Sequence, residues 1–116
     1  MIDIYLASPY SHEDPYIRSK RYHQALEATA YYLKQGLTIF SPIAYAHNIH
    51  VTHFPFHDSE GWLRLDLAFL PHCKLLYILM LDGWEESKGI KREIDEAEKL
   101  GIPIVYAQPR SIGVKA

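Results

Sequence analysis

Short apolar runs recur along the chain, at residues 2–7, 37–40, 75–81 and 102–107. Each has the length and the β-branched or aromatic content of a buried strand. The run at residues 75–81 is apolar throughout, as is typical of a central strand of a parallel sheet that is covered on both faces.

Longer segments with a helical period separate these runs. Apolar side chains recur at helical spacing in residues 15–35, 59–70 and 87–100, and Gly36 and Gly101 supply stop signals. Strands that alternate with helices predict a parallel sheet with helices on both faces. We therefore expect an α/β fold, a flavodoxin- or Rossmann-like three-layer sandwich around a small parallel sheet of about four to five strands.

Two segments lack a clear period. Residues 41–58 contain prolines and several histidines, and we expect them to form a long functional loop over the edge of the sheet. The tail at residues 109–116 is expected to be loosely structured or free to meet a partner. No linker divides the chain, so residues 1–116 are predicted to form a single domain.

Two acidic residues occupy positions where a helix should be apolar. On helical wheels, Asp66 falls in the middle of the apolar face of its helix, and Glu93 falls inside the apolar arc of the last helix. A buried carboxylate must be paired, be protonated or line a cavity. Pairing with Arg18 or Arg21 would explain either acid alone. Two inward carboxylates near the ligand crevice, which lies at the carboxyl ends of the strands, favour an active site.

The start of the first helix carries groups that suit an anion. Arg18 and Arg21 lie near its amino end, and the hydroxyls of Ser8 and Ser11 precede it. Together with free backbone N–H groups they could cradle a phosphate. Ordinary ion pairs between the arginines and nearby acids are the alternative.

Aromatic residues are expected in the loops at the crevice. Tyr10, Tyr45 and Trp84 lie there, where their faces could stack on a nucleobase, although aromatic residues are as often core or interface residues. Trp84 is ranked first because it follows Asp82 and Gly83 directly beyond the central strand. Asp82 could bind a sugar hydroxyl or merely shape the turn.

Histidines gather in the segment without a period. His47, His50, His53 and His57, followed by Asp58, suggest a metal site, but their spacing fits no compact zinc pattern. We therefore expect no metal and no cofactor. His47 is the preferred ligand contact, to a phosphate or a base, and a solvated loop histidine is the alternative.

Composition narrows the choice of partners. The chain has 116 residues and a net charge of -2, without the clustered lysines and arginines that binding to long nucleic acid requires. The single Cys73 cannot form an intramolecular disulfide, and no apolar run approaches the roughly 20 residues of a membrane helix. We expect a cytoplasmic protein with no membrane partner.

Three stretches of the sequence together resemble a known family. The runs IYLASPYS, FSPI followed by AH, and LDLAFLPHCKLLYILMLDGWEESKGIKREIDEA are similar to the nucleoside 2-deoxyribosyltransferase-like superfamily. This superfamily includes the deoxyribosyltransferases and the deoxynucleoside 5'-monophosphate N-glycosidases, and the small bacterial and phage members are the most similar. The most specific part is the order of Asp66, a hydrophobic strand, Ser87, Gly89 and Glu93.

The resemblance implies a role for each matching residue. Glu93 would attack the anomeric carbon of a 2-deoxyribose to form a covalent glycosyl-enzyme, Asp66 would assist the leaving base or orient the sugar, and Tyr5 would position the nucleophile. Serines matching Ser8 and Ser87 would contact the sugar 5' group or its phosphate. The helical wheels select the same two carboxylates independently. The expected substrate contacts are Ser8, Pro9, Tyr10, Arg18, Arg21, His47, Asp82, Gly83, Trp84, Ser87 and Gly89.

The expected partner is a small nucleoside or nucleotide. The leading hypothesis is a hydrolase that cleaves the N-glycosidic bond of a 2'-deoxynucleoside 5'-monophosphate. The alternatives are base exchange by a nucleoside 2-deoxyribosyltransferase and a non-catalytic nucleotide-binding or sensing module. Hydrolysis is favoured because the chain is shorter than typical transferases. Relatives often complete each site from a neighbouring subunit, which implies a homodimer or homotetramer and suggests a role for the tail around Ser111.

Overall fold

The computed structural model describes residues 1–52 and 59–115, and in this part of the chain all strands belong to one parallel sheet. The strand order is β2-β1-β3-β4, with β1 and β3 at the centre. The register places Tyr5 opposite Phe40 on one side and opposite Leu76 on the other. The strands are β1 (Ile2–Ala7), β2 (Ile39–Phe40), β3 (Cys73–Leu79) and β4 (Ile104–Ala107).

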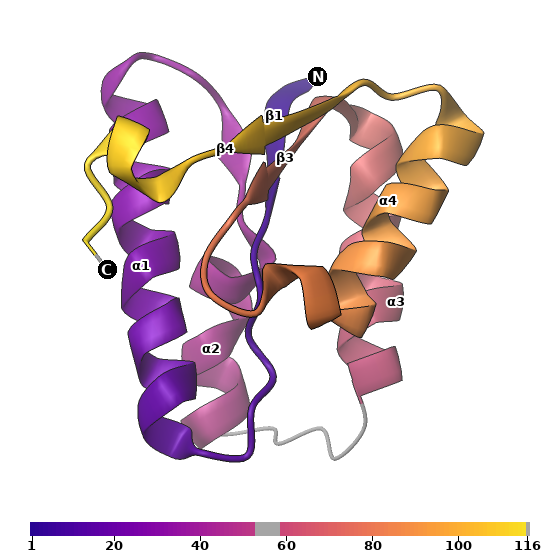
Figure 1. The fold of residues 1–116 in the computed structure, drawn as a ribbon. Coiled ribbons are helices and arrows are strands. Elements are labelled where there is room, and N and C mark those ends of the chain that lie inside the picture. Colours follow the sequence, from indigo (N-terminus) through magenta and orange to yellow (C-terminus); the bar gives the residue numbers. More distant parts are fainter. Residues whose placement is uncertain (53–58, 116) are drawn as a thin grey trace.

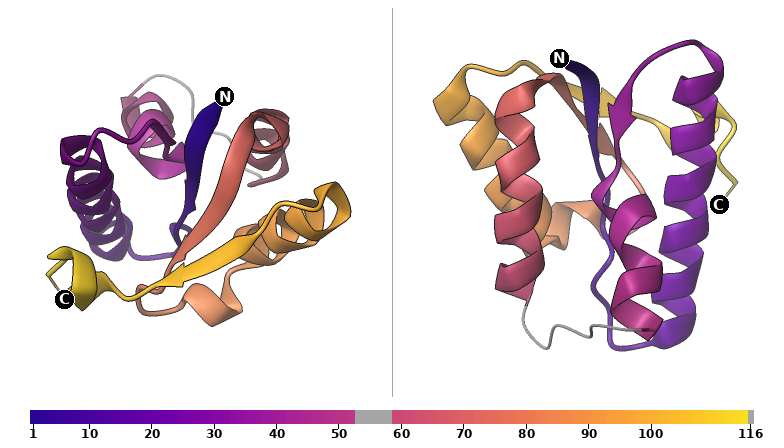
Figure 2. Two further views of the ribbon diagram at one scale, coloured as in Figure 1. Left: turned by 90° about the horizontal axis from the view of Figure 1, so that it is seen from above. Right: turned by 180° about the vertical axis from the view of Figure 1, so that it is seen from behind.

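Helices cover both faces of the sheet (Figure 1). They are α1 (Pro15–Lys34), α2 (Pro42–Thr52), α3 (Ser59–Phe69) and α4 (Lys88–Leu100). Viewed from above, α1 and α2 lie on one side of the strands and α3 and α4 on the other (Figure 2). The predicted α/β fold, a three-layer sandwich around a small parallel sheet, is therefore confirmed.

Local sequence signals fix the ends of the helices. Asp14 caps α1, where its side chain accepts a hydrogen bond from the backbone N–H of Tyr16. Ser87 caps α4 in the same way and accepts from the N–H of Ile90 at 3.2 Å. The left-handed backbone of Gly101, with φ of 72°, ends that helix.

Each face of the sheet has its own buried cluster. Ile4 and Leu6 of β1 pack with Tyr32 of α1 on one face. Tyr5 and Ala7, which point the other way, pack with residues such as Ile90 of α4. The alternation along β1 thus sends Tyr5 toward the layer formed by α3 and α4.

The prediction of a long loop at residues 41–58 was wrong for the part that the structure describes. Residues Pro42–Thr52 form α2, whose backbone hydrogen bonds begin where the N–H of Tyr45 donates to the carbonyl of Ser41. Proline at the first position does not interrupt a helix, because its missing N–H has no helical partner there. His53, His57 and Asp58 lie outside the described residues.

The prediction of a loose tail was also wrong. Pro109–Ile112 form a short 3-10 helix, η3, and the side chains of Ile112 and Val114 are buried in the cluster that includes α1. Hydrogen bonds between Gln24 and Glu27 of α1 and the backbone of Lys115 hold the tail in place. The tail therefore packs on the core through Ile112 and Val114, while Ser111 itself is exposed and its role toward a neighbouring subunit stays a prediction.

Among the described residues, no helix is both long enough and apolar enough to cross a lipid bilayer.

Candidate active site

A cavity of about 770 Å3 opens at the carboxyl ends of β1 and β3. The loop after β1, the start of α4, and helices α2 and α3 meet at this end of the molecule (Figure 1). The cavity brings together most of the residues predicted from the sequence. Those that line it are Ser8, Pro9, Tyr10, Arg18, Arg21, His47, Asp66, Gly83, Ser87, Gly89 and Glu93.

Glu93 lies on the first turns of α4 and is only 5% exposed. The hydroxyl of Tyr5, a fully buried residue of β1, donates a hydrogen bond to its Oε2. Burial raises the pKa of Glu93 to about 8, an effect that the Tyr5 hydrogen bond opposes. Burial and the nearby Glu93 carboxylate raise the pKa of Tyr5 well above its usual value, so Tyr5 keeps its proton and acts as a donor.

Asp66 reaches the same cavity from α3 and is 8% exposed. Its Oδ1 is buried and has no hydrogen-bond partner among the described residues. Burial raises the pKa of Asp66 to about 7. A buried carboxyl group without a partner is stable only in its neutral form or beside a ligand.

The two carboxyl groups titrate together, because the charge of Asp66 also raises the pKa of Glu93. Near neutral pH the pair therefore carries one negative charge. Although the pKa of Asp66 is raised only to about 7 and that of Glu93 to about 8, we assign the charge to Glu93, because the Tyr5 hydrogen bond stabilises it there and Oδ1 of Asp66 receives no such bond. This arrangement gives one anionic group and one proton donor in the same cavity.

Hydroxyl and cationic groups line another part of the cavity. The Ser8 hydroxyl is buried and has no hydrogen-bond partner among the described residues. Arg18, Ser87 and the exposed Lys88 also line the cavity, and Nη1 of Arg18 donates to the carbonyl of His12. The amino end of α4, with its free N–H groups and positive dipole end, starts here.

Arg21 is occupied by the backbone. Its Nη1 donates to the carbonyl of Ser11 at 2.9 Å, and its Nη2 donates to the carbonyl of Asp82 at 3.0 Å. The side chain therefore joins the loop after β1 to the loop after β3. A Cβ at Gly83 would lie 2.5 Å from Nη2 of Arg21 and would shift the end of this side chain, and the φ of +88° at Gly83 favours glycine in its own right.

Aromatic rings enclose His47. Its Nδ1 is hydrogen-bonded to the hydroxyl of Tyr10 at 2.7 Å, and its ring stacks on Tyr22 with centroids 4.0 Å apart and planes at 17°. Burial lowers the pKa of His47, and the nearby His50, His23 and Arg18 lower it further. His47 is therefore neutral near pH 7.

The sequence did not predict the wall that α2 and α3 form. Ile43, Ala46 and His50 line the cavity beside His47, and Trp62 of α3 also lines it. The α2 residues are spaced as one face of a helix, and this period was the signal that could have revealed them. The histidines and prolines of the segment hid it.

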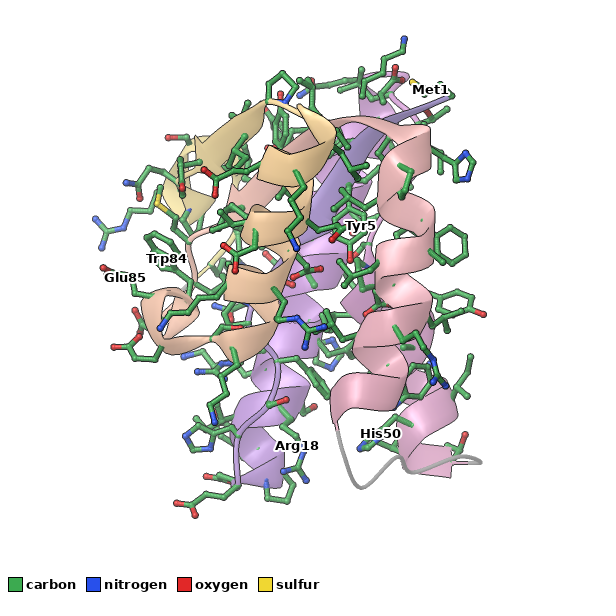
Figure 3. All side chains as sticks on the ribbon, turned by 90° about the vertical axis from the view of Figure 1, so that its right-hand side faces the viewer. Met1, Tyr5, Arg18, His50, Trp84 and Glu85 are labelled. Carbon is green, nitrogen blue, oxygen red and sulfur yellow. The ribbon has the colours of Figure 1, made fainter. Side chains whose placement is uncertain are left out.

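The structure does not bring three of the predicted aromatic and polar contacts to the cavity. Trp84 packs against Tyr106, with ring centroids 5.7 Å apart, and does not line the cavity. In Figure 3 the labels of Trp84 and His50 lie on opposite sides of α4. Asp82 is exposed, and its carbonyl accepts from Arg21. Tyr45 lies beside Phe40 and is half exposed. Tyr5 lies behind Glu93 and does not line the cavity itself.

No three His, Cys, Asp or Glu side chains in residues 1–52 and 59–115 are grouped so that they could hold a metal ion. The groups that the cavity presents to a ligand are carboxyl, hydroxyl, cationic and aromatic side chains.

The chain has the fold of a 2-deoxyribosyltransferase, so the fold that the resemblance in the sequence implies is confirmed. A solved 2-deoxyribosyltransferase from the psychrotolerant bacterium Bacillus psychrosaccharolyticus is similar in structure, with a TM-score of 0.65 and 22% sequence identity. The match covers 92% of this chain and 72% of that one. Within this fold, the chain belongs to a family described as a domain of unknown function, DUF1937, whose profile matches residues 2–108. No curated protein matches the sequence.

Proposed function

We propose that the protein is an enzyme that hydrolyses the N-glycosidic bond of a 2'-deoxynucleoside 5'-monophosphate. The observation that carries this proposal is the pair of buried carboxyl groups, Asp66 and Glu93, which reach one cavity from two helices. The similar 2-deoxyribosyltransferase supports a reaction at a deoxyribose.

The first half of the reaction uses both acids. The Glu93 carboxylate attacks C1' of the sugar, and the bond between C1' and the base nitrogen breaks with its electron pair moving to the base. Asp66, in its protonated form, donates a proton to the departing base. Tyr5 holds the attacking carboxylate in position through its hydrogen bond to Oε2. The products of this step are a free base and a glycosyl ester on Glu93.

The second half releases the sugar. Asp66, now ionised, takes a proton from a water molecule, whose oxygen attacks C1' and displaces the Glu93 carboxylate. The overall reaction consumes one water and yields the free base and deoxyribose 5-phosphate. Both acids return to their starting protonation states, so the cycle is balanced.

The cavity also has groups that suit the 5'-phosphate. The unpaired Ser8 hydroxyl, the amino end of α4 and the side chains of Arg18 and Lys88 could donate to phosphate oxygens. Glu86 lines the cavity too, and its charge opposes anion binding. We assign the phosphate to Ser8 and the start of α4, where the unpaired hydroxyl and the helix N–H groups can donate to it.

Base exchange is the second candidate, because the similar solved protein is a 2-deoxyribosyltransferase, described as a biocatalyst for nucleoside synthesis. The two reactions share the glycosyl-enzyme and differ only in what accepts the sugar. Exchange requires a new nucleoside to form only when a second free base is supplied. Hydrolysis requires sugar phosphate to accumulate without one.

A base-release assay tests the proposal. Purified protein is incubated with a panel of deoxynucleotides and deoxynucleosides, and the free base and sugar products are separated by chromatography. We expect release from at least one nucleotide, with Glu93→Gln losing at least about a thousandfold in rate. Glu98→Gln, an exposed acid on the same helix, is the matched control and should retain full activity.

The same panel tests the non-catalytic alternative. Thermal stabilisation by a nucleotide without any base release would support a binding or sensing module and would exclude both enzyme reactions. For the phosphate assignment, Ser8→Ala should raise KM for the nucleotide and leave KM for the matching nucleoside unchanged. An equal effect on both substrates would remove Ser8 from the phosphate site.

A cytoplasmic location, a single domain over residues 1–116 and a homodimer or homotetramer stay predictions. Sedimentation analysis of the purified protein would measure the oligomeric state.

A further inference from the structure

The wall formed by α2 has a chemical character that the proposed reaction does not use. Ile43, Ala46, His47 and His50 lie on one face of this helix and line the cavity, and Trp62 of α3 lines it as well. An apolar wall with a few polar atoms is typical of a pocket that binds a planar ligand.

His47 is held in a single orientation. Its ring stacks on Tyr22 at a centroid distance of 4.0 Å, and its Nδ1 is bonded to the Tyr10 hydroxyl at 2.7 Å. Among the described residues no hydrogen bond reaches Nε2 of His47. Since the ring lines the cavity, Nε2 is the nitrogen available to a ligand.

The contact with Tyr10 decides which nitrogen of His47 carries the proton. A phenol hydroxyl is a strong hydrogen-bond donor, and the unprotonated nitrogen of a neutral imidazole is a strong acceptor. The 2.7 Å contact is therefore assigned with the Tyr10 hydroxyl as donor and Nδ1 of His47 as acceptor. The hydroxyl hydrogen is then directed to Nδ1 of His47, and the neutral imidazole carries its own hydrogen on Nε2.

His50 supplies a second polar atom to the same wall. Its Nδ1 is buried and has no hydrogen-bond partner in the described part of the chain. The ring meets Tyr10 edge to face, with centroids 6.2 Å apart, and lies 6.3 Å from the ring of Trp62. His50 can present either a donor or an acceptor, whereas His47 presents a fixed donor.

We propose that the α2 wall binds the nucleobase and that the Nε2–H of His47 selects bases with a carbonyl oxygen at the edge that faces α2. This inference rests on the proposed function, which places a nucleotide in the cavity. Uracil, thymine, hypoxanthine and guanine carry a carbonyl at the position where cytosine and adenine carry an amino group. An amino group cannot accept from Nε2–H, so a buried donor would lose its partner.

Two pairs of nucleotides isolate this contact. Deoxyuridine and deoxycytidine monophosphates differ at the carbonyl or amino group of C4, together with the adjacent ring proton. Deoxyinosine and deoxyadenosine monophosphates differ in the same way at C6. In the pair that the protein accepts, we expect kcat/KM to be about tenfold to a hundredfold higher for the carbonyl member. Equal values, or a preference for the amino member, would overturn the inference.

Variants distinguish the effect of the His47 hydrogen bond from the effect of pocket shape on base preference. His47→Phe keeps a ring against Tyr22 but removes both nitrogens. It should bring the ratio of kcat/KM for the carbonyl nucleotide to kcat/KM for the amino nucleotide close to one. Tyr10→Phe frees the tautomer of His47 and should lower the ratio while the cavity keeps its aromatic lining. His72→Phe, at an exposed position of the short helix before β3, is the control and should keep the full ratio. An unchanged ratio in both His47→Phe and Tyr10→Phe would overturn the inference.

Binding measurements distinguish this inference from the proposed function. Thermal stabilisation by the same nucleotide pairs needs no turnover. Stronger thermal stabilisation by the nucleotides with a carbonyl base, without base release, would support the contact of His47 with the base and contradict the proposed hydrolysis. Base release without any preference would uphold the enzyme and reject the contact. The absence of both binding and release would reject the two together.

Discussion

The hydroxyl of Tyr5 donates a hydrogen bond to Oε2 of Glu93, a residue 88 positions away in the chain. Tyr5 lies in the central strand β1, and Glu93 lies near the start of α4. The sheet thereby supports the carboxylate to which we assign the attack on the sugar. Because both side chains are buried, this contact is set by the folded core and not by solvent.

Replacing Tyr5 with phenylalanine should slow base release by about tenfold to a hundredfold at neutral pH, because a hydrogen bond to a charged group is lost. The pKa of Glu93 should rise further, which leaves less of the anionic nucleophile. Rates measured at saturating substrate would test this. Tyr32→Phe, a buried tyrosine on the other face of the sheet, is the control. A rate unaffected by Tyr5→Phe would show that the hydrogen bond has no part in the reaction.

The rate of base release should depend on pH with a maximum. Below the pKa values of about 7 and about 8 both acids are neutral, so no nucleophile is present. Above them both are ionised, so no proton donor remains. We expect kcat/KM to peak between these values and to fall on both sides. Measurements from pH 5 to 9 test this, and a flat profile would contradict the assignment of the two roles.

The stability of the protein should fall as the pH rises from the unfolded pKa values of Asp66 and Glu93, 3.8 and 4.5, to their folded values of about 7 and about 8. The pKa values of Asp66 and Glu93 are raised in the folded state from 3.8 and 4.5, so the folded protein binds more protons than the unfolded chain. Their contribution is fully present below the unfolded values and is lost as the pH rises through about 7 and about 8.

Asp66→Asn and Glu93→Gln should each reduce the loss of folding stability that the natural protein shows as the pH rises. At pH 8.5 we expect each variant to be more stable than the natural protein by on the order of 2 kcal/mol, with a much smaller difference at about pH 5. Urea unfolding at the two pH values gives the free energies. Glu98→Gln should show the natural pH dependence. Variants that are less stable than the natural protein at both pH values would contradict the predicted cost of ionising the buried pair.

Gly83→Ala should destabilise the protein more than Gly36→Ala does. Both glycines have positive φ, of 88° and 82°, so each substitution costs roughly 1 kcal/mol of backbone strain. A Cβ at Gly36 meets nothing within 4 Å, whereas one at Gly83 would displace Nη2 of Arg21 from the carbonyl of Asp82. We expect an additional loss of about 1 kcal/mol from this hydrogen bond.

Thermal or urea unfolding of the two glycine variants measures the difference. Arg21→Ala provides a further comparison, because it breaks the same bridge without straining the backbone. If Gly36→Ala and Gly83→Ala lose equal stability, Arg21 does not hold the two loops together.

The burial of the two acids could be predicted from the sequence because it follows from local periodicity. Asp66 and Glu93 fall on the apolar faces of helices whose phase is fixed by their neighbours. The hydrogen bond from Tyr5 could not be predicted from such patterns, since it joins a strand to a helix through the pairing of the sheet. Its position was expected only from the resemblance to the family.

Other parts of the site depended on packing that no short segment reveals. The role of Arg21 as a bridge between loops depends on the carbonyls of Ser11 and Asp82, and backbone carbonyls leave no mark on the sequence. Trp84 was expected in the cavity because of its place after β3, but the turn at Gly83 directs its ring toward Tyr106. The tail was misjudged because Ile112 and Val114 are isolated apolar residues without a period.

The carboxyl groups and the α2 wall belong to different layers of the sandwich. Asp66 and Glu93 stand on α3 and α4, while His47 and His50 stand on α2, across the sheet (Figure 2). If the proposed roles hold, a substitution on α2 would alter the choice of base while the core that supports the acids stays intact. The two tasks of the site would then be open to separate engineering, one layer at a time.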